Sequence, residues 1–460
     1  MRLYNTLTRS VEEFVPRDEG QVTIYVCGPT VQGPPHFGHV RMAIVPDVLR
    51  RYLEWQGYDV LHVRNITDVE DKIIATAHLE GRSAAVVAED YARTWQQGID
   101  ALGCLPPHVV PRATGHILEM QELIARLIEL DVAYPSGGDV YFSVRAFDGY
   151  GKLSRRDPDQ LRAGSRVAAG EQKRDPLDFA LWKASKPDEP SWPSPWGDGR
   201  PGWHIECSAM ATKYLGQPFD IHMGGTDLVF PHHENELAQS EAATSEQFAR
   251  FWVHHGMLNF GQEKMAKSVG NTVSLAEAVE RYGSDTVRLF FLRADYRSPV
   301  EFSEERLDEA AAALERFTAF LRVADALTVS GRAEVAEQAR AAFREAMDDD
   351  LATPRAHAVL FDLVRDGHRA LETGDEATAV GARDALRELT GVLGYRLEAA
   401  AAVDSELVAS LVSELLSLRA QARSRRDFAT ADAIRERLEA AGVAVEDTPE
   451  GARWHVTRGG

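Results

Sequence analysis

The sequence predicts an α/β core of Rossmann type that carries an inserted connective segment, followed by an α-helical bundle and a small C-terminal domain. Three observations lead to this prediction. The N-terminal part has a strand pattern, a helix pattern and a second strand pattern in close succession. Residues 111–200 interrupt the core and are rich in proline near their end. From Glu304 onward the chain is rich in Ala, Leu, Glu and Arg at helical spacing.

The first three elements predict a β-α-β unit. Apolar residues alternate along Gln21–Cys27, and Gly28-Pro29 ends this strand. Apolar residues then recur at helical spacing along Gly38–Trp55, and Asp59–Ile66 has the pattern of a second strand. Such a unit implies a parallel sheet with a right-handed crossover. Ligands bind at the carboxyl ends of the strands in these sheets, so we expect the chemistry between Cys27 and His39.

The remaining patterns set the expected domain limits. Residues 1–303 form the core, with the insertion at about 111–200; residues 304–402 form the helical bundle and residues 403–460 the C-terminal domain. Gly137-Gly138 in the insertion precedes a hairpin-like stretch, and proline-rich Lys186–Gly202 is expected to be a long irregular connection. The last domain is expected to contain two helices and a short strand at Ala452–Val456.

The composition excludes several classes of protein. The 460 residues are 44% hydrophobic and 27% charged, which excludes a largely disordered chain. No stretch reaches the roughly 18 apolar residues that a membrane helix needs, and Met1–Pro16 lacks the apolar segment of a signal peptide. Three cysteines argue against a disulfide scaffold, and a net charge of −20 argues against coating nucleic acid through bulk charge. We expect a cytoplasmic, monomeric enzyme without membrane association.

Two short motifs suit a nucleotide polyphosphate. His36-Phe37-Gly38-His39 lies between the first strand and its helix, where imidazoles and free N–H groups could donate hydrogen bonds to a phosphate. Lys264-Met265-Ala266-Lys267-Ser268 lies between two glycines, and its lysines could follow the charge on a departing group. Each motif also has a simple alternative, namely surface histidines and a solvated charged loop.

A second set of residues suits a metal ion. Cys27 ends the first strand, Cys207 lies far downstream, and His232 and Glu236 are spaced so that a helix would present both on one face. Two thiolates, an imidazole and a carboxylate can hold Zn²⁺ tetrahedrally. The alternative is a pair of buried cysteines beside a capped polar helix. A metalloprotease is excluded, because Leu237 occupies the place of the second histidine in H-E-x-x-H.

The two phosphate motifs together resemble the signature sequences of class I aminoacyl-tRNA synthetases, with Phe37 where that family often has Ile and Ala266 where it usually has Ser. Nearly the whole chain is similar to the cysteinyl-tRNA synthetase family. The segments that carry this resemblance are Cys27–Val40, Arg64–Ile73, Gly202–Met210, Asp220–Gln239 and Lys264–Asn271, and it extends into Arg425–Leu438 and Asp447–Trp454.

The resemblance implies an ATP-dependent, AMP-forming ligase whose partners are L-cysteine, ATP and tRNA(Cys), with one Zn²⁺ per chain and Mg²⁺ bound with ATP. It implies zinc ligands at Cys27, Cys207, His232 and Glu236, and catalytic groups at His36, His39, Lys264 and Lys267. The implied ATP-binding residues are Thr30, His36, Gly38, His39, Gly225, Asp227, Lys264, Lys267 and Ser268. The cysteine substrate would contact Thr30, Asn65, Thr67 and Trp203, and tRNA would contact Arg425, Arg426 and Trp454.

Zinc explains how such an enzyme could distinguish cysteine from serine. A pocket that tolerates a hydroxyl group separates such isosteres by only roughly 10²-fold, whereas a soft metal binds a thiolate far better than an alcohol. Two other functions stay open at this stage. One is a cysteine ligase that acts on an amino sugar in mycothiol biosynthesis, which would lack the domain at residues 403–460. The other is a zinc-stabilised RNA-binding protein without catalytic activity.

Overall fold

The computed structural model describes residues 1–162, 172–259, 274–397, 405–448 and 451–456. The chain divides into two compact units, Met1–Leu397 and Glu398–Gly460. Among the described residues, no helix combines the length and the apolar character that crossing a membrane requires.

A four-stranded parallel sheet forms the centre of the first unit. Its strand order is β10-β9-β3-β4, with β3 (Gln21–Val26), β4 (Asp59–Arg64), β9 (Phe219–Gly225) and β10 (Ala249–His255). The two strands expected from the sequence are adjacent and parallel, and Val26 lies opposite Arg64. Because all four strands run in the same direction, their carboxyl ends meet at one edge of the sheet.

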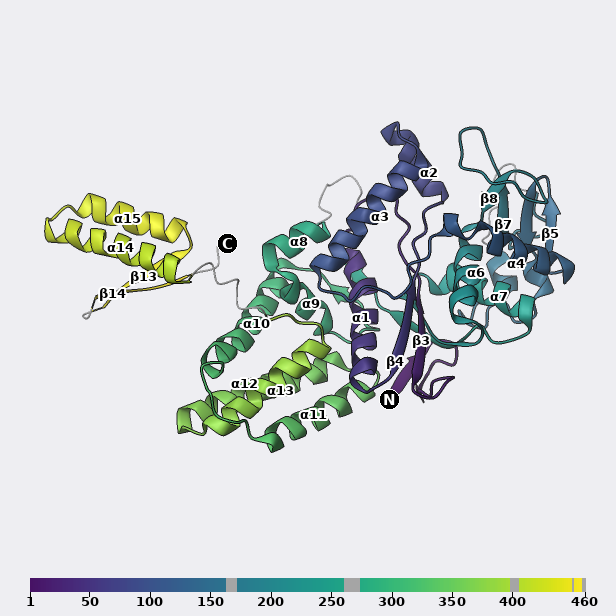
Figure 1. Cartoon of the computed structure of the whole chain (residues 1–460). Coiled ribbons are helices and arrows are strands. Elements are labelled where there is room, and N and C mark those ends of the chain that lie inside the picture. Colours follow the sequence, from purple (N-terminus) through teal and green to yellow (C-terminus); the bar gives the residue numbers. More distant parts are fainter. Residues whose placement is uncertain (163–171, 260–273, 398–404, 449–450, 457–460) are drawn as a thin grey trace. The chain divides into compact units, whose positions relative to one another are not determined.

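Helices lie against the central sheet and connect its strands along the chain (Figure 1). Helix α1 (Val40–Trp55) is the predicted crossover helix; it buries an apolar face that includes Ile44, Leu49 and Leu53. Helices α6 (Trp203–Leu215) and α7 (Glu234–Thr244) pack against each other. The other elements around the core are β1 (Arg2–Asn5), β2 (Ser10–Glu13), α2 (Asp71–Glu80), α3 (Ala84–Ala101), β11 (Leu258–Asn259), α8 (Leu275–Tyr282), α9 (Ser284–Leu292) and β12 (Val300–Glu301).

The inserted segment has a sheet of its own, of order β5-β6-β7-β8 and antiparallel throughout. Its elements are α4 (Ile117–Glu129), β5 (Ala133–Ser136), β6 (Asp139–Phe142), α5 (Pro158–Arg162), β7 (Phe179–Ala184) and β8 (Gly199–Pro201). The Gly137-Gly138 turn joins β5 to β6 in a hairpin, and both glycines have positive φ. The expectation of an irregular connection over 186–202 was wrong at its end, because β8 pairs with β7 there and leads directly into α6.

Four long helices follow the core in the same unit: α10 (Glu304–Ala324), α11 (Ala333–Asp348), α12 (Thr353–Thr373) and α13 (Glu376–Val392). A buried ion pair joins these helices to the core. The Arg288 guanidinium on α9 is fully buried, and it donates to Asp47 on α1 at 2.5 Å and to the Leu393 carbonyl at 2.8 Å. One side chain thus holds α9, α1 and the end of α13 together.

The second unit contains α14 (Ser405–Ser424), α15 (Phe428–Ala440) and a hairpin of β13 (Val443–Thr448) and β14 (Gly451–Val456). A small core made of Val412, Leu438, Val443 and Val445 holds it together. The sequence predicted the two helices and the last strand but missed β13. Without β13 the predicted strand would have had no hydrogen-bonding partner.

We predict that Asp47→Ala lowers the free energy of unfolding of this protein by about 3–5 kcal/mol, because the substitution leaves the buried Arg288 charge without its counter-ion. The measurement is urea unfolding followed by intrinsic fluorescence. The control is Asp362→Ala, which removes an ion pair with Arg365 in which both side chains are exposed. Equal losses in the two variants would contradict the importance of the buried pair.

Candidate active site

A cavity of about 690 Å³ opens at the carboxyl ends of the central strands. Most of the site residues expected from the sequence line it: Cys27, Thr30, His36, Gly38, His39, Asn65, Thr67, Trp203, Cys207, Gly225, Asp227 and His232. Gly28 follows β3 and Asn65 follows β4, and the two approach each other closely. Position 28 requires glycine, since a Cβ there would lie 1.6 Å from the Asn65 carbonyl oxygen. The Gly28 N–H donates to Asn65 Oδ1 at 2.8 Å.

The four expected metal ligands lie together, and Cys27, Cys207 and His232 among them line this cavity. Cys27 follows β3, Cys207 is on α6, His232 is in the short turn η4 (Val229–His233) before α7, and Glu236 is on α7. Their ligand atoms all lie within 4.8 Å of one another, and all four side chains are buried. Cys27 Sγ is 3.7 Å from Cys207 Sγ and 3.3 Å from Glu236 Oε1. His232 Nε2 is 2.9 Å from the same carboxylate oxygen.

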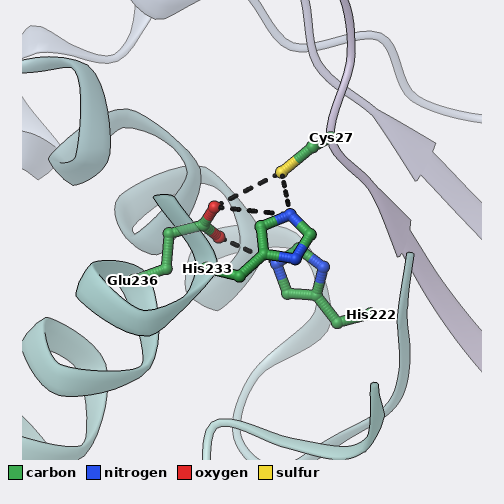
Figure 2. A group of neighbouring side chains, drawn as sticks. All are labelled: Cys27, His222, His233 and Glu236. Atoms are coloured by element: carbon green, nitrogen blue, oxygen red, sulfur yellow. Dashed lines mark hydrogen bonds and ion pairs between the residues drawn. The ribbon is translucent and has the colours of Figure 1, made fainter. Parts of the chain in front are cut away.

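Two further histidines that the sequence analysis missed complete a second possible ligand group with Cys27 and Glu236 (Figure 2). His222 Nε2 is 2.8 Å from Glu236 Oε2, and His233 Nε2 is 3.3 Å from Cys27 Sγ. Neither histidine lines the cavity, whereas Cys27, Cys207 and His232 do. The first group is therefore the one that a substrate can reach, and His222 and His233 lie behind it as hydrogen-bonding partners.

These partners continue into a longer chain of hydrogen bonds. His233 Nδ1 is 2.8 Å from His254 Nε2, and His254 Nδ1 is 2.8 Å from Thr6 Oγ1. On the other side, His204 Nδ1 is 2.9 Å from His232 Nδ1, which leaves Nε2 of His232 for the metal side. The sequence is rich in histidine around β9 and β10, which could have drawn attention to His222, His233 and His254. Their hydrogen-bonding partners, however, include residues on elements distant in the chain.

The ionisation of the four ligands follows from burial and their mutual contacts. Burial and the neighbouring Cys207 raise the pKa of Cys27 well above its ordinary value. Burial also opposes ionisation of Cys207, but hydrogen bonds from Cys27 and His232 outweigh it and lower its pKa to about 6. Burial disfavours the charged form of His232 too, yet the Glu236 carboxylate raises its pKa to about 10. At pH 7 the metal-free group thus contains a Cys27 thiol and a protonated His232.

His36 and His39 form an N-terminal cap for the helical turn before α1. The Gly38 N–H donates to His36 Nδ1 at 3.1 Å, and the His36 N–H donates to His39 Nδ1 at 3.2 Å. Because a backbone N–H can only donate, each Nδ1 must accept, and the ring proton of each neutral imidazole lies on Nε2. Burial lowers the pKa of both rings, that of His39 to about 3. The cavity therefore receives two neutral imidazoles with N–H donors.

Trp203 and Thr67 lie on the wall of the cavity near the metal group. The Trp203 ring stacks on His232 with a centroid distance of 4.2 Å. Thr67 Oγ1 donates to Glu206 Oε2 at 2.9 Å, and Asn65 Nδ2 donates to Thr67 Oγ1 at 3.3 Å. Glu206 is fully buried and was missed by the sequence analysis. This network fixes the Thr67 hydroxyl and the Asn65 amide relative to Cys207, the neighbour of Glu206.

The other predicted residues lie in different environments. Asp227 is exposed at the cavity edge, next to Gly225. Lys264, Lys267 and Ser268 lie outside the described residues. In the second unit, Arg425 and Arg426 are exposed, while Trp454 is partly buried against the small core. Phe428, two residues after Arg426, is 59% exposed and is an aromatic side chain that the sequence analysis did not select.

The fold is that of the class I aminoacyl-tRNA synthetases. A methionyl-tRNA synthetase from Mycobacterium tuberculosis in complex with methionyl-adenylate superposes with a TM-score of 0.60 at 18% identity, over 81% of this chain and 89% of that one. A LeuRS–tRNA–LeuAMS ternary complex from Agrobacterium radiobacter K84 gives a TM-score of 0.57 at 14% identity, over 83% and 84%.

The family follows from the sequence comparisons. Residues 13–312 match the class I (C) tRNA synthetase catalytic domain, residues 342–398 the DALR domain and residues 408–454 the cysteinyl-tRNA ligase anticodon binding domain. The chain is 47% identical to the cysteine–tRNA ligase of Geobacter metallireducens over 99% of both chains, and 48% identical to that of Halorhodospira halophila over 100% of both. The chain belongs to the cysteine–tRNA ligase family.

We predict that metal binding at this group is steeply pH-dependent between pH 7 and 8. A metal ion must displace the protons of Cys27 and His232, whose pKa values both lie above this range. Affinity should therefore rise with pH, by about tenfold per pH unit for each of the two protons released. Zn²⁺ titration of the metal-free protein against a chelator measures the slope. A pH-independent affinity would contradict this assignment of the protons.

Proposed function

We propose that this cysteine–tRNA ligase recognises its amino acid through a zinc ion at the base of the cavity. The overall reaction joins L-cysteine to the 3′ end of tRNA(Cys) and converts ATP to AMP and pyrophosphate. The observation that carries the proposal is a buried group of two thiols, an imidazole and a carboxylate, of which the two thiols and the imidazole line the same cavity as the His36 and His39 donors. The match of residues 408–454 to an anticodon binding domain favours tRNA over an amino sugar as acceptor.

The residues present fit zinc. Cys27, Cys207, His232 and Glu236 supply the sulfur, nitrogen and oxygen ligands that zinc prefers, within a distance that one ion can span. Bound there, zinc would supply a soft Lewis acid for the sulfur of the substrate. Three of the ligands face the cavity, and Trp203, stacked on His232, would cover the bound side chain. Thr30, Asn65 and Thr67 would hold the amino and carboxyl groups.

The first chemical step is attack of the cysteine carboxylate on the α-phosphorus of ATP, with pyrophosphate as the leaving group. No protein nucleophile is needed, and the protein contributes position and charge stabilisation. His36 and His39 would donate Nε2–H hydrogen bonds to the phosphates at the N-terminal end of α1. Lys264, Lys267 and Ser268 would follow the departing pyrophosphate, and Mg²⁺ would accompany ATP.

The nucleoside of ATP would lie beside Gly225 and Asp227 in the same cavity. Gly38 and Gly225 allow a close approach to the backbone, and Asp227 would accept a hydrogen bond from a ribose hydroxyl. In the second step, a hydroxyl of the tRNA 3′-terminal ribose attacks the carbonyl carbon of the adenylate and AMP leaves.

The C-terminal unit would contact tRNA. Arg425 and Arg426 are exposed and can pair with phosphates, and Trp454 was expected to stack on a base. Phe428 offers a more exposed ring beside these arginines. The proposed domains are a catalytic core at 1–303, a helical bundle at 304–402 and this tRNA-binding domain at 403–460. All three cysteines are free thiols, which supports a reducing compartment such as the cytoplasm.

We predict that Cys207→Ala lowers bound zinc from about one ion per chain to a small fraction, and lowers cysteine-dependent ATP–pyrophosphate exchange by at least about 10²-fold, because the site loses one ligand. Metal analysis of the purified protein and the exchange assay measure both effects. The matched control is Cys104→Ala, which removes a buried thiol outside the cavity and should leave zinc and exchange unchanged. Full zinc content in Cys207→Ala would remove this residue from the metal site.

A further inference from the structure

His255 is a cavity residue that neither the sequence motifs nor the metal group account for. It is the last residue of β10, it lines the cavity and its side chain is 6% exposed. It lies opposite Gly225 in the parallel pairing of β9 with β10. The Thr226 N–H donates to the His255 carbonyl at 3.0 Å, so the turn that carries Asp227 is tied to this residue.

The hydrogen bonds around His255 fix its tautomer. Nδ1 lies 3.2 Å from the Gly256 carbonyl oxygen, and because a carbonyl can only accept, Nδ1 must carry the proton. Burial lowers the pKa of His255 to about 4, so the ring is neutral at neutral pH. Nε2 is then a hydrogen-bond acceptor, and it is buried without a partner among the described residues.

The backbone beside His255 is held firmly. The Gly256 carbonyl also accepts from Arg41 Nη1 at 3.0 Å, and Arg41 is 1% exposed. A Cβ at position 256 would lie 2.4 Å from the Ser298 carbonyl oxygen, so glycine is required there. The Gly256 carbonyl that accepts the Nδ1 proton of His255 is therefore itself fixed in position.

The free acceptor is close to the proposed nucleoside position. A Cβ built on Gly225 would lie 3.5 Å from His255 Cε1, the atom next to Nε2, and 2.3 Å from Asp227 Oδ1. The imidazole and the carboxylate thus flank the same small space above Gly225. Two acceptors side by side match a ligand that presents neighbouring hydrogen-bond donors.

We propose that Nε2 of His255 accepts a hydrogen bond from a donor group on the nucleoside of ATP. This proposal rests on the proposed assignment of Gly225 and Asp227 to the nucleotide. The donor is an N–H or O–H group, which the nucleoside can supply either as a ribose hydroxyl or as the exocyclic amino group of adenine. His255 acts as a binding residue that aligns ATP with the cysteine carboxylate.

Two substitutions test the roles of the two ring nitrogen atoms separately. His255→Asn retains an amide that can donate to the Gly256 carbonyl but has no atom at the Nε2 position. His255→Gln can place its amide oxygen near the Nε2 position as an acceptor. We expect KM for ATP in cysteine-dependent pyrophosphate exchange to rise roughly three- to tenfold in His255→Asn, the range for one lost hydrogen bond, and to recover in His255→Gln. KM for cysteine should not change in either variant.

ATP analogues identify the donor. With 2′-deoxyATP, 3′-deoxyATP and the triphosphate of purine riboside, one analogue should raise KM in the wild type but cause no further rise in His255→Asn. If every analogue affects both proteins equally, or if His255→Asn and His255→Gln have the same KM for ATP, the proposal is overturned. Asp227→Ala separates the two assignments, because it removes the acceptor that Asn would retain. If it leaves KM for ATP unchanged, the nucleotide position itself is wrong; if it raises KM while His255→Asn does not, only the role of His255 is wrong.

Discussion

The active site depends on the burial of one carboxylate, Glu236. A fully buried charge is costly unless it is paired, and Glu236 is paired on two sides, by His222 from β9 and by His232 from the turn before α7. Burial raises the pKa of Glu236, but these histidines outweigh it and hold the pKa well below the ordinary value. Cys27 contacts the same carboxylate from the end of β3. The sheet and α7 are therefore held in the arrangement that the metal group requires.

The side of the cavity that His36 and His39 line, where we propose that the phosphates bind, is organised by a different kind of contact. His36 and His39 are neutral, and backbone N–H groups, not ion pairs, fix the orientation of their rings. Their Nε2–H donors can thus contact phosphate without a change of protonation state. His255 is oriented in the opposite sense, because a carbonyl group holds its Nδ1 proton and leaves Nε2 as an acceptor. These three imidazoles thus have two fixed roles, because Nδ1 of His36 and of His39 accepts from a backbone N–H whereas Nδ1 of His255 donates to a backbone carbonyl.

Much of the fold could be predicted from the sequence, because β3, α1 and β4 are local patterns of alternation and helical spacing. The motifs with His36, His39, Cys207 and His232 could be selected because each is a short cluster of reactive residues. His222, Glu206 and His255 could not, because their roles depend on partners far along the chain or on a backbone carbonyl. Strand β13 was missed for a similar reason, since only its pairing with β14 defines it.

Loading the metal-free protein with cobalt gives the most direct test of whether a metal ion at this group contacts the sulfur of the substrate. Cobalt bound to thiolates has a charge-transfer absorption that grows when another thiolate binds. Addition of L-cysteine to the cobalt-substituted enzyme should increase this absorption, and the same concentration of L-serine should leave it unchanged. An absorption that cysteine does not alter, although cysteine supports pyrophosphate exchange, would contradict selection of the amino acid at the metal.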